Sequence, residues 1–204
     1  MTAATTGNYA SLDDKGKKVI ADWVGDMVAI EAHIEEALDA QLKVKDQVPA
    51  AASSVQTFHD TTKANRDRLR SYQEKIGSTG GNPVIDAGAS ILGKAAGLID
   101  RFRNDTLTKA IRDDYTAFNH ASVGYTLLHT TALALGDGET ADLAAQNLKV
   151  HASNVQHINH IISDVAMAEI QKDGYPVKNT NAAAETRKAI DSIWKETDQA
   201  GTSL

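Results

Sequence analysis

Apolar residues recur at alternating intervals of three and four along several long stretches of the chain, and this spacing is its most constraining feature. The pattern runs through residues 12–47, 50–76, 105–135 and 139–172. It gathers apolar side chains into one stripe along an α-helix. A helix with such a stripe must bury it against other helices. The sequence therefore predicts four long helices that pack as a bundle.

The connections between these stretches predict how the helices follow one another. The first two stretches, and likewise the last two, are separated by few residues, so each pair is expected to be antiparallel. Residues 77–104 separate the pairs and are numerous enough to run the length of the bundle. Aromatic residues make up 5% of the chain, and no stretch alternates with the period of a strand. We predict an all-α fold, a ferritin-like four-helix bundle with a long helical crossover between its second and third helices.

The segments outside the four helices complete the predicted domain organisation. Residues 1–10 are expected to be a disordered arm, and residues 11–172 the bundle. An amphipathic crossover helix at about 84–103 is expected to cover one face of the bundle. Residues 173–204 form a tail with a helix at about 181–198, which is expected to dock on the bundle or on a second subunit.

Composition and charge exclude several classes of function. The 204 residues include 27 acidic and 21 basic ones, a net charge of −6, which argues against nucleic-acid binding. No cysteine is present, so disulfides and thiolate chemistry are excluded. No apolar run is long enough to span a membrane, and the N-terminus lacks the pattern of a secretory signal. We expect a cytoplasmic protein, and a homo-oligomer, most simply a dimer.

Polar residues interrupt the apolar stripes near their middles. A carboxylate in an apolar bundle is costly to bury unless it is paired or binds a metal ion. Two interpretations stay open. Glu31 and His151 bind one iron, manganese or zinc ion, or they are metal-free and form a hydrogen-bonded pair or specify the register of the helices. The interrupting residues are Glu31 in the first helix, Thr62 and Asn65 in the second, Asp114 in the third, with His120 beside its stripe, and His151 and Asn154 in the fourth.

A second set of metal-ligand residues lies on another face of the fourth helix. His157, His160 and Asp164 are spaced so that they share that face, and two imidazoles with a carboxylate are competent ligands. The face is rotated by about 120° from the stripe that contains His151, so we expect it to be solvated.

Four stretches of the sequence resemble one known family. Residues 26–31, DMVAIE, are similar to its D-L-Y-x-A-E, and residues 66–77, RDRLRSYQEKIG, to its x-E-R-L-x-x-x-F-x-x-L-G. Residues 118–125, FNHASVGY, fall where the family has E-H-Y-E-I-A-A-Y, and residues 147–154, NLKVHASN, where it has T-L-x-E-E-x-x-A/D. By these motifs, in this order, residues 20–172 resemble the YciF-like ferritin-like stress proteins of bacteria.

The resemblance implies a metal centre of which this chain retains part. Ferritin-like di-iron proteins use glutamates from all four helices, with histidines on two of them. Glu31 matches the first of these glutamates, whereas Ala121 replaces the one expected in the third helix. What remains is a mononuclear site of Glu31, His120 and His151, or a site that has lost its metal.

Three functions follow as hypotheses. The first is a stress-type bundle with a remodelled or lost metal site. The second is a metal-dependent oxidase or peroxide-handling enzyme that uses Glu31 and His151. The third is a metal-free dimerisation or interaction module.

Overall fold

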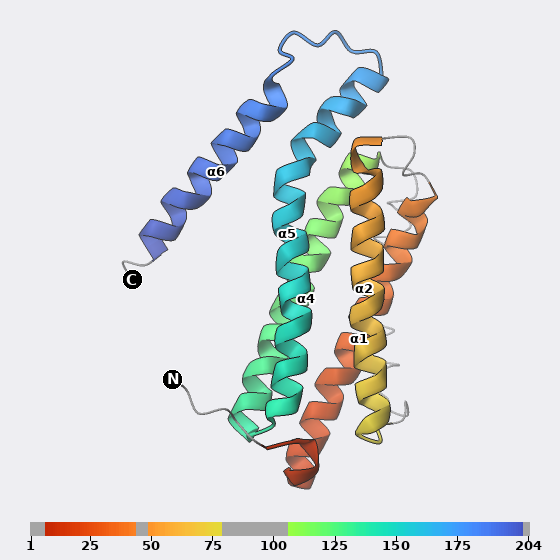
Figure 1. The fold of residues 1–204 in the computed structure, drawn as a ribbon, viewed down its shortest axis with the longest axis vertical. Coiled ribbons are helices and arrows are strands. Elements are labelled where there is room, and N and C mark those ends of the chain that lie inside the picture. The colour runs from red at the N-terminus through yellow and green to blue at the C-terminus, as the bar shows by residue number, and fades with distance from the viewer. Residues whose placement is uncertain (1–6, 44–48, 79–105, 202–204) are drawn as a thin grey trace.

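The structure is a computed structural model that describes residues 7–43, 49–78 and 106–201 (Figure 1). Within these residues the chain is helical and has no strand, as predicted for an all-α protein. The observed bounds lie within a few residues of the expected ones, apart from an earlier end of the first helix. The elements are a 3-10 helix, η1 (Tyr9–Ser11), and the α-helices α1 (Asp14–Leu42), α2 (Pro49–Lys75), α4 (Leu107–Leu135), α5 (Gly138–Lys172) and α6 (Ala182–Gly201).

Helices α4 and α5 form a tight hairpin whose turn is specified by two residues. Gly136 ends α4 with a φ of 81°, a backbone conformation that glycine adopts without steric cost. Asp137 then caps α5, because its carboxylate accepts the backbone N–H of Thr140 at 3.1 Å. The hydroxyl of Thr140 also lies 2.6 Å from that of Tyr72 on α2. The turn therefore anchors the hairpin to the end of α2.

Side-chain pairs show how the two hairpins pack. Glu31 of α1 contacts Tyr125 of α4, whereas Gln41, farther along α1, contacts Asp114, which precedes Tyr125 on α4. The order of residues along one helix is thus reversed along the other, so α1 and α4 are antiparallel. In the same way, Thr61 of α2 contacts Asn154 of α5, whereas Tyr72, farther along α2, contacts Thr140, which precedes Asn154. Helices α2 and α5 are therefore antiparallel as well.

Helices α2 and α4 run in the same direction. Figure 1 shows α2 and α4 starting at the same end of the bundle. Ser78, after α2, and Thr106, before α4, therefore lie at opposite ends of the bundle. The expected crossover helix at about 84–103 lies outside the described residues. Each bundle helix packs on two others, α1 on α2 and α4, and α5 on α2 and α4.

The core follows the predicted apolar stripes. Phe58 of α2 and Phe118 of α4 meet edge to face, with ring centroids 5.3 Å apart, near the middle of the bundle. Gly124 lets α4 approach α1 closely, since a Cβ atom there would lie 2.6 Å from the sulfur of Met27. Other fully buried apolar side chains of the core are Ile20, Val24, Leu38, Val55, Leu69, Ile111 and Leu128.

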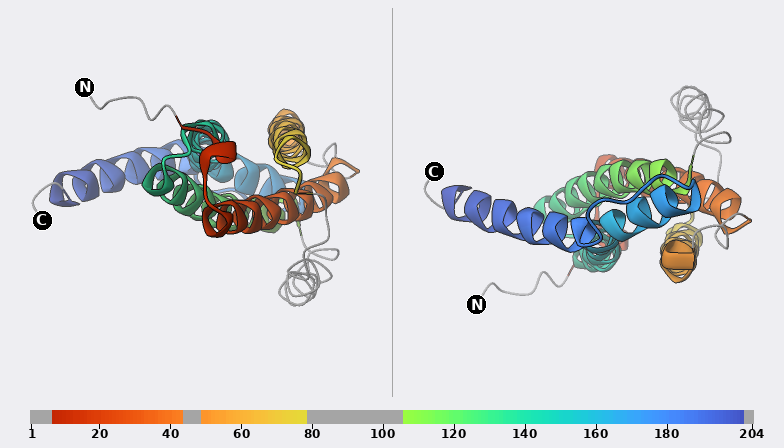
Figure 2. Two further views of the ribbon diagram at one scale, coloured as in Figure 1. Left: turned by 90° about the horizontal axis from the view of Figure 1, so that it is seen from below. Right: turned by 90° about the horizontal axis from the view of Figure 1, so that it is seen from above.

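The tail helix α6 folds back along α5 (Figures 1 and 2). Ala183 is buried, and Arg187 forms an ion pair with Asp164 of α5. Farther along α6, Ile193 and Trp194 are 60% and 50% exposed. In this single chain, α6 thus packs on the chain's own bundle.

Residues 7–10 differ from the disordered arm expected for residues 1–10. The carbonyl oxygen of Gly7 accepts the N–H of Gly138 at 3.0 Å, and the following residues form η1. The side chain of Tyr9 packs against the bundle core. This anchoring between sequence-distant backbone groups leaves no periodic signal in the sequence. Residues 1–6 lie outside the described residues. In the described part of the chain, no helix has an apolar stretch that could cross a membrane.

Candidate functional site in the bundle core

Glu31, Tyr125 and His151 meet at the centre of the bundle, from α1, α4 and α5. The Nε2 atom of His151 lies 2.7 Å from Oε1 of Glu31, and the Tyr125 hydroxyl donates a hydrogen bond to the same oxygen. All three side chains have no solvent exposure. The carboxylate predicted on the first helix and the histidine predicted on the fourth are therefore direct partners.

Burial keeps the Tyr125 hydroxyl protonated. Loss of solvent raises the pKa of Tyr125 far above its ordinary value, and the carboxylate of Glu31 raises it further. The hydroxyl therefore acts as a fixed donor to Glu31. It also accepts a hydrogen bond from the side-chain amide of Asn147, at 3.0 Å.

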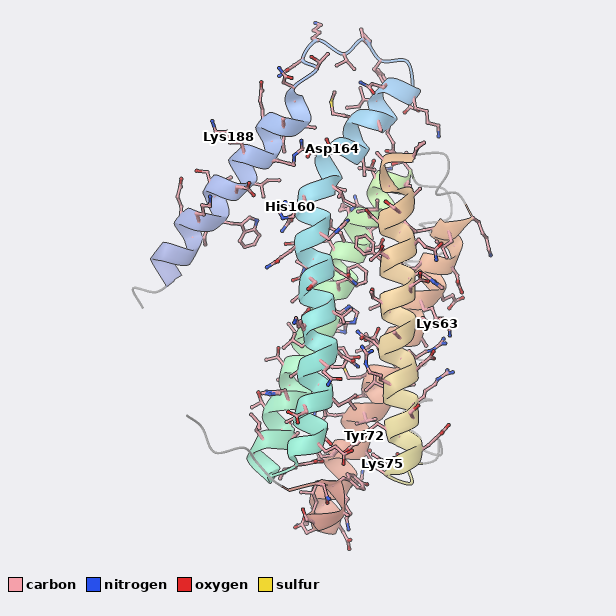
Figure 3. The ribbon with its side chains drawn as sticks, in the orientation of Figure 1. Lys63, Tyr72, Lys75, His160, Asp164 and Lys188 are labelled. Atoms are coloured by element: carbon pink, nitrogen blue, oxygen red, sulfur yellow. The ribbon has the colours of Figure 1, made fainter. Side chains whose placement is uncertain are left out.

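A second layer of polar side chains connects this centre to the surface between α2 and α5. Arg68 donates through Nε to Oδ1 of Asn147 at 3.0 Å, and through Nη2 to Oδ1 of Asn65. Arg68 also lines a shallow groove with Tyr72 and Lys75, which lie near the end of α2 in Figure 3. The hydrogen bonds therefore run without a break from this groove to the buried carboxylate.

Aromatic rings enclose the imidazole of His151. The ring of Tyr125 is stacked on it, with centroids 5.7 Å apart and an angle of 21° between the planes. The ring of Phe118 lies on it with centroids 5.4 Å apart. The imidazole thus has a largely apolar surrounding and a single polar contact, its hydrogen bond to Glu31.

Three polar atoms at this level of the bundle have no hydrogen-bond partner among the described residues. They are Oε2 of Glu31, Nδ1 of His151 and Oγ1 of Thr62. Thr62 belongs to this level because its neighbours Thr61 and Asn65 contact Asn154 and Asn147 on either side of His151. Buried polar atoms without a protein partner are typically satisfied by an ordered water or a ligand.

Two other predicted polar residues are buried but belong to other contacts. Asn154 donates to the hydroxyl of Thr61 at 3.2 Å. Asp114 accepts a hydrogen bond from Nε2 of Gln41 at 2.8 Å, nearer the end of the bundle where α1 ends and α4 begins. Burial raises the pKa of Asp114 to about 7, and the neighbouring charge of Asp113 adds to the shift. Asp114 therefore stands apart from the Glu31 site.

His120 does not belong to the site, which corrects the prediction that it is a third ligand. Its side chain is exposed, whereas its neighbour Ala121 is fully buried. Successive residues of a helix are rotated by about 100°, and here Ala121 faces the core while His120 points to solvent. The described residues contain no group of three His, Asp or Glu side chains that could hold a metal ion.

The second predicted set of ligands is solvated, as expected, and its members have separate partners. The Nε2 atom of His157 lies 2.8 Å from the hydroxyl oxygen of Ser54. Asp164 pairs with Arg187 on the side of α5 that faces α6, where Figure 3 also places His160. These three side chains do not form a shared metal site in the described structure.

Sequence reasoning missed three residues that complete the site: Tyr125, Asn147 and Arg68. Tyr125 falls on the apolar stripe of its helix, and only the position of its hydroxyl in the structure reveals its role. The spacing of apolar residues before His151 favours Leu148 as an inward residue of α5, but the structure buries Asn147 completely and Leu148 partly. The spacing of Asn147 and His151, one helical turn apart, is the signal that could have indicated it.

Comparison with known proteins assigns the chain to a family. A family model described as "Domain of unknown function (DUF892)" matches residues 16–171, most of the chain. The chain belongs to the DUF892 family. This is the YciF-like family, so the resemblance noted in the sequence is confirmed at that level. No curated protein and no solved structure matches the chain. The match spans all four bundle helices and therefore includes the Glu31 site.

Proposed function

We propose that this protein is a ferritin-like bundle of the bacterial stress-response type whose central metal site has become a metal-free polar core. In this proposal it acts by binding or protecting another molecule and catalyses no reaction. The course of the chain supports the ferritin-like part, because two antiparallel hairpins joined across the length of the bundle are the arrangement of that fold.

The observation that carries the proposal is the pairing of the two ligand-type side chains with each other. Oε1 of Glu31 already accepts hydrogen bonds from Tyr125 and His151, and Nε2 of His151 is occupied by the same contact. A di-iron centre of the ferritin-like type uses carboxylates from all four helices. The inward polar positions here carry amides and a hydroxyl instead: Thr62, Asn65, Asn147 and Asn154. This donor set does not fit two iron ions.

One observation favours a second candidate, a mononuclear metal site in an oxidase or peroxide-handling protein. Oε2 of Glu31, Nδ1 of His151 and Oγ1 of Thr62 are buried without partners. One carboxylate, one imidazole and ordered waters are ligands that iron, manganese or zinc accepts. An ordered water bonded to these atoms is the corresponding metal-free interpretation.

Metal analysis separates the two candidates. We would purify the full chain, incubate it with iron, manganese or zinc, remove unbound metal and measure the content by mass spectrometry. The matched control is the double variant Glu31→Gln/His151→Gln, which keeps hydrogen-bonding side chains of similar size. The proposal predicts the same low content in both proteins. About one ion per chain in the wild type, and none in the variant, would overturn it in favour of the mononuclear site.

A further inference from the structure

The outer side of α4 is a surface without charge. Residues 115–135 of α4 contain no Asp, Glu, Lys or Arg, although the chain as a whole carries 48 such residues. Ten of these helix residues are exposed, among them Val123 at 60% and Leu127 at 46%. Exposed helix surfaces of soluble proteins ordinarily mix charges of both signs. A helix face of this kind is typical of a contact with another surface.

Part of this face forms one straight row, which we call the α4 outer stripe. Its members are spaced alternately by four and three residues, the spacing with which one helix packs along another. At 1.5 Å per residue the row is about 27 Å long. The α4 outer stripe consists of Thr116, His120, Val123, Leu127, Thr130 and Ala134, all of which are exposed.

Three polar side chains in or beside the stripe are hydrogen-bonded within α4. The hydroxyl of Thr130 donates to the carbonyl of Thr126, and that of Thr126 to the carbonyl of Ser122, each at 2.8 Å. The side-chain amide of Asn119 donates to the carbonyl of Tyr115 at the same distance. These three groups need no new partner when the surface is covered, so covering them carries little desolvation penalty.

We propose that the α4 outer stripe is the interface of a homodimer, in which α4 packs antiparallel against α4 of a second copy about a two-fold axis. A two-fold interface must be complementary to itself. The stripe meets this condition when it is reversed about position 125: Val123 then faces Leu127 of the second copy, His120 faces Thr130, and Thr116 faces Ala134. Apolar residues meet apolar residues, and the small side chains meet at the ends.

Charge also favours a second copy as the occupant. Two chains that each carry a net charge of −6 repel one another, and the repulsion is weakest where their facing surfaces are uncharged. A partner recognised through opposite charge would find no charged group along this row. The axis would pass beside Gly124 and Tyr125, directly outside the Glu31 site.

The first test is the mass of the full chain in solution, measured by sedimentation over 1 to 100 μM. The proposal predicts twice the 21.8 kDa mass of one chain. It also predicts that Leu127→Glu raises the dissociation constant by about 100-fold or more, because two unpaired carboxylates are then placed in the contact. Leu133→Glu is the matched control, since Leu133 is 44% exposed on the same helix but lies outside the stripe. Circular dichroism checks that each variant keeps its helix content.

A charge pair tests the antiparallel register. Val123→Lys alone should weaken the dimer as Leu127→Glu does. In the double variant, each new lysine would face a new glutamate of the second copy, so dimerisation should return. A wild-type chain that is monomeric at 100 μM would overturn the proposal and assign the stripe to another occupant. A dimer that Leu127→Glu leaves intact, that Leu133→Glu weakens equally, or that the double variant fails to restore would overturn it as well.

Discussion

Oε1 of Glu31 lies 2.7 Å from Nε2 of His151 in a part of the bundle that solvent does not reach. The two residues are 120 positions apart in the chain, and each is a polar residue within a largely apolar helix stripe. A buried carboxylate and imidazole stabilise the fold only as a pair, because either one alone would leave an unsatisfied polar group in the core.

The first prediction concerns this pair. Glu31→Leu removes the acceptor of both His151 and Tyr125, and we expect it to lower the free energy of unfolding by about 3 to 5 kcal/mol. Glu31→Gln retains an acceptor oxygen and should lower it by about 1 to 2 kcal/mol. Urea denaturation measures both values. The double variant Glu31→Leu/His151→Leu should lose less than the sum of the single losses, and strict additivity would contradict a direct pair.

The second prediction concerns Asp114 and pH. Its pKa in the folded protein, about 7, is higher than its ordinary value of 3.8, so the folded state holds this proton more tightly than the unfolded state does. Its contribution to stability therefore falls as the pH rises from about 4 to 7, by up to about 4 kcal/mol, and stays constant above that range. Asp114→Asn removes this dependence and keeps an amide partner for Gln41.

Urea denaturation at pH 5 and pH 8 checks the Asp114 prediction. The stability gained by Asp114→Asn, relative to the wild type, should be larger at pH 8 than at pH 5. Asp142→Asn is the control, since Asp142 is an exposed carboxylate on α5. An equal difference at both pH values would show that Asp114 does not titrate in this range.

The third prediction concerns the close approach of α1 and α4. A methyl group at Gly124 would lie 2.6 Å from the sulfur of the fully buried Met27, so Gly124→Ala should destabilise the protein by about 1 to 2 kcal/mol. Gly25→Ala is the matched control on α1, because the nearest side-chain atom to its added methyl lies at 3.8 Å. There the gain in helix propensity should raise stability by up to about 1 kcal/mol. Thermal unfolding of both variants gives the comparison, and equal effects would contradict the packing argument.

The fourth prediction concerns α6. This helix packs on α5 and on no other bundle helix to a comparable extent. A chain that ends after residue 176 should keep the helix content of the bundle and lose only the α6 signal in circular dichroism. Its dimer should also persist, because the α4 outer stripe is untouched. A truncated chain that becomes monomeric would place the dimer contact on α6 instead.

The helices and most inward residues were predictable because they depend on local periodicity. The alternation of three and four residues specified which face of each helix is buried, and Glu31, Thr62, Asn65 and His151 all lie on those faces. The error at His120 has the same origin, since neighbouring positions differ by a rotation that an approximate phase does not resolve. The absence of three-ligand clusters in the described structure depends on distances between helices, which periodicity does not contain.

The amino-acid sequence by itself therefore determined that this protein is a bundle of long helices, that its family is YciF-like, and that a carboxylate and a histidine face its core. The tertiary structure alone decided what these two groups contact. Whether a buried Glu meets a His, a Tyr hydroxyl or a metal depends on the register between helices far apart in the chain, and that register is established by the packing of the whole core. The joining of Glu31, Tyr125 and His151 to Asn147 and Arg68 results from this packing.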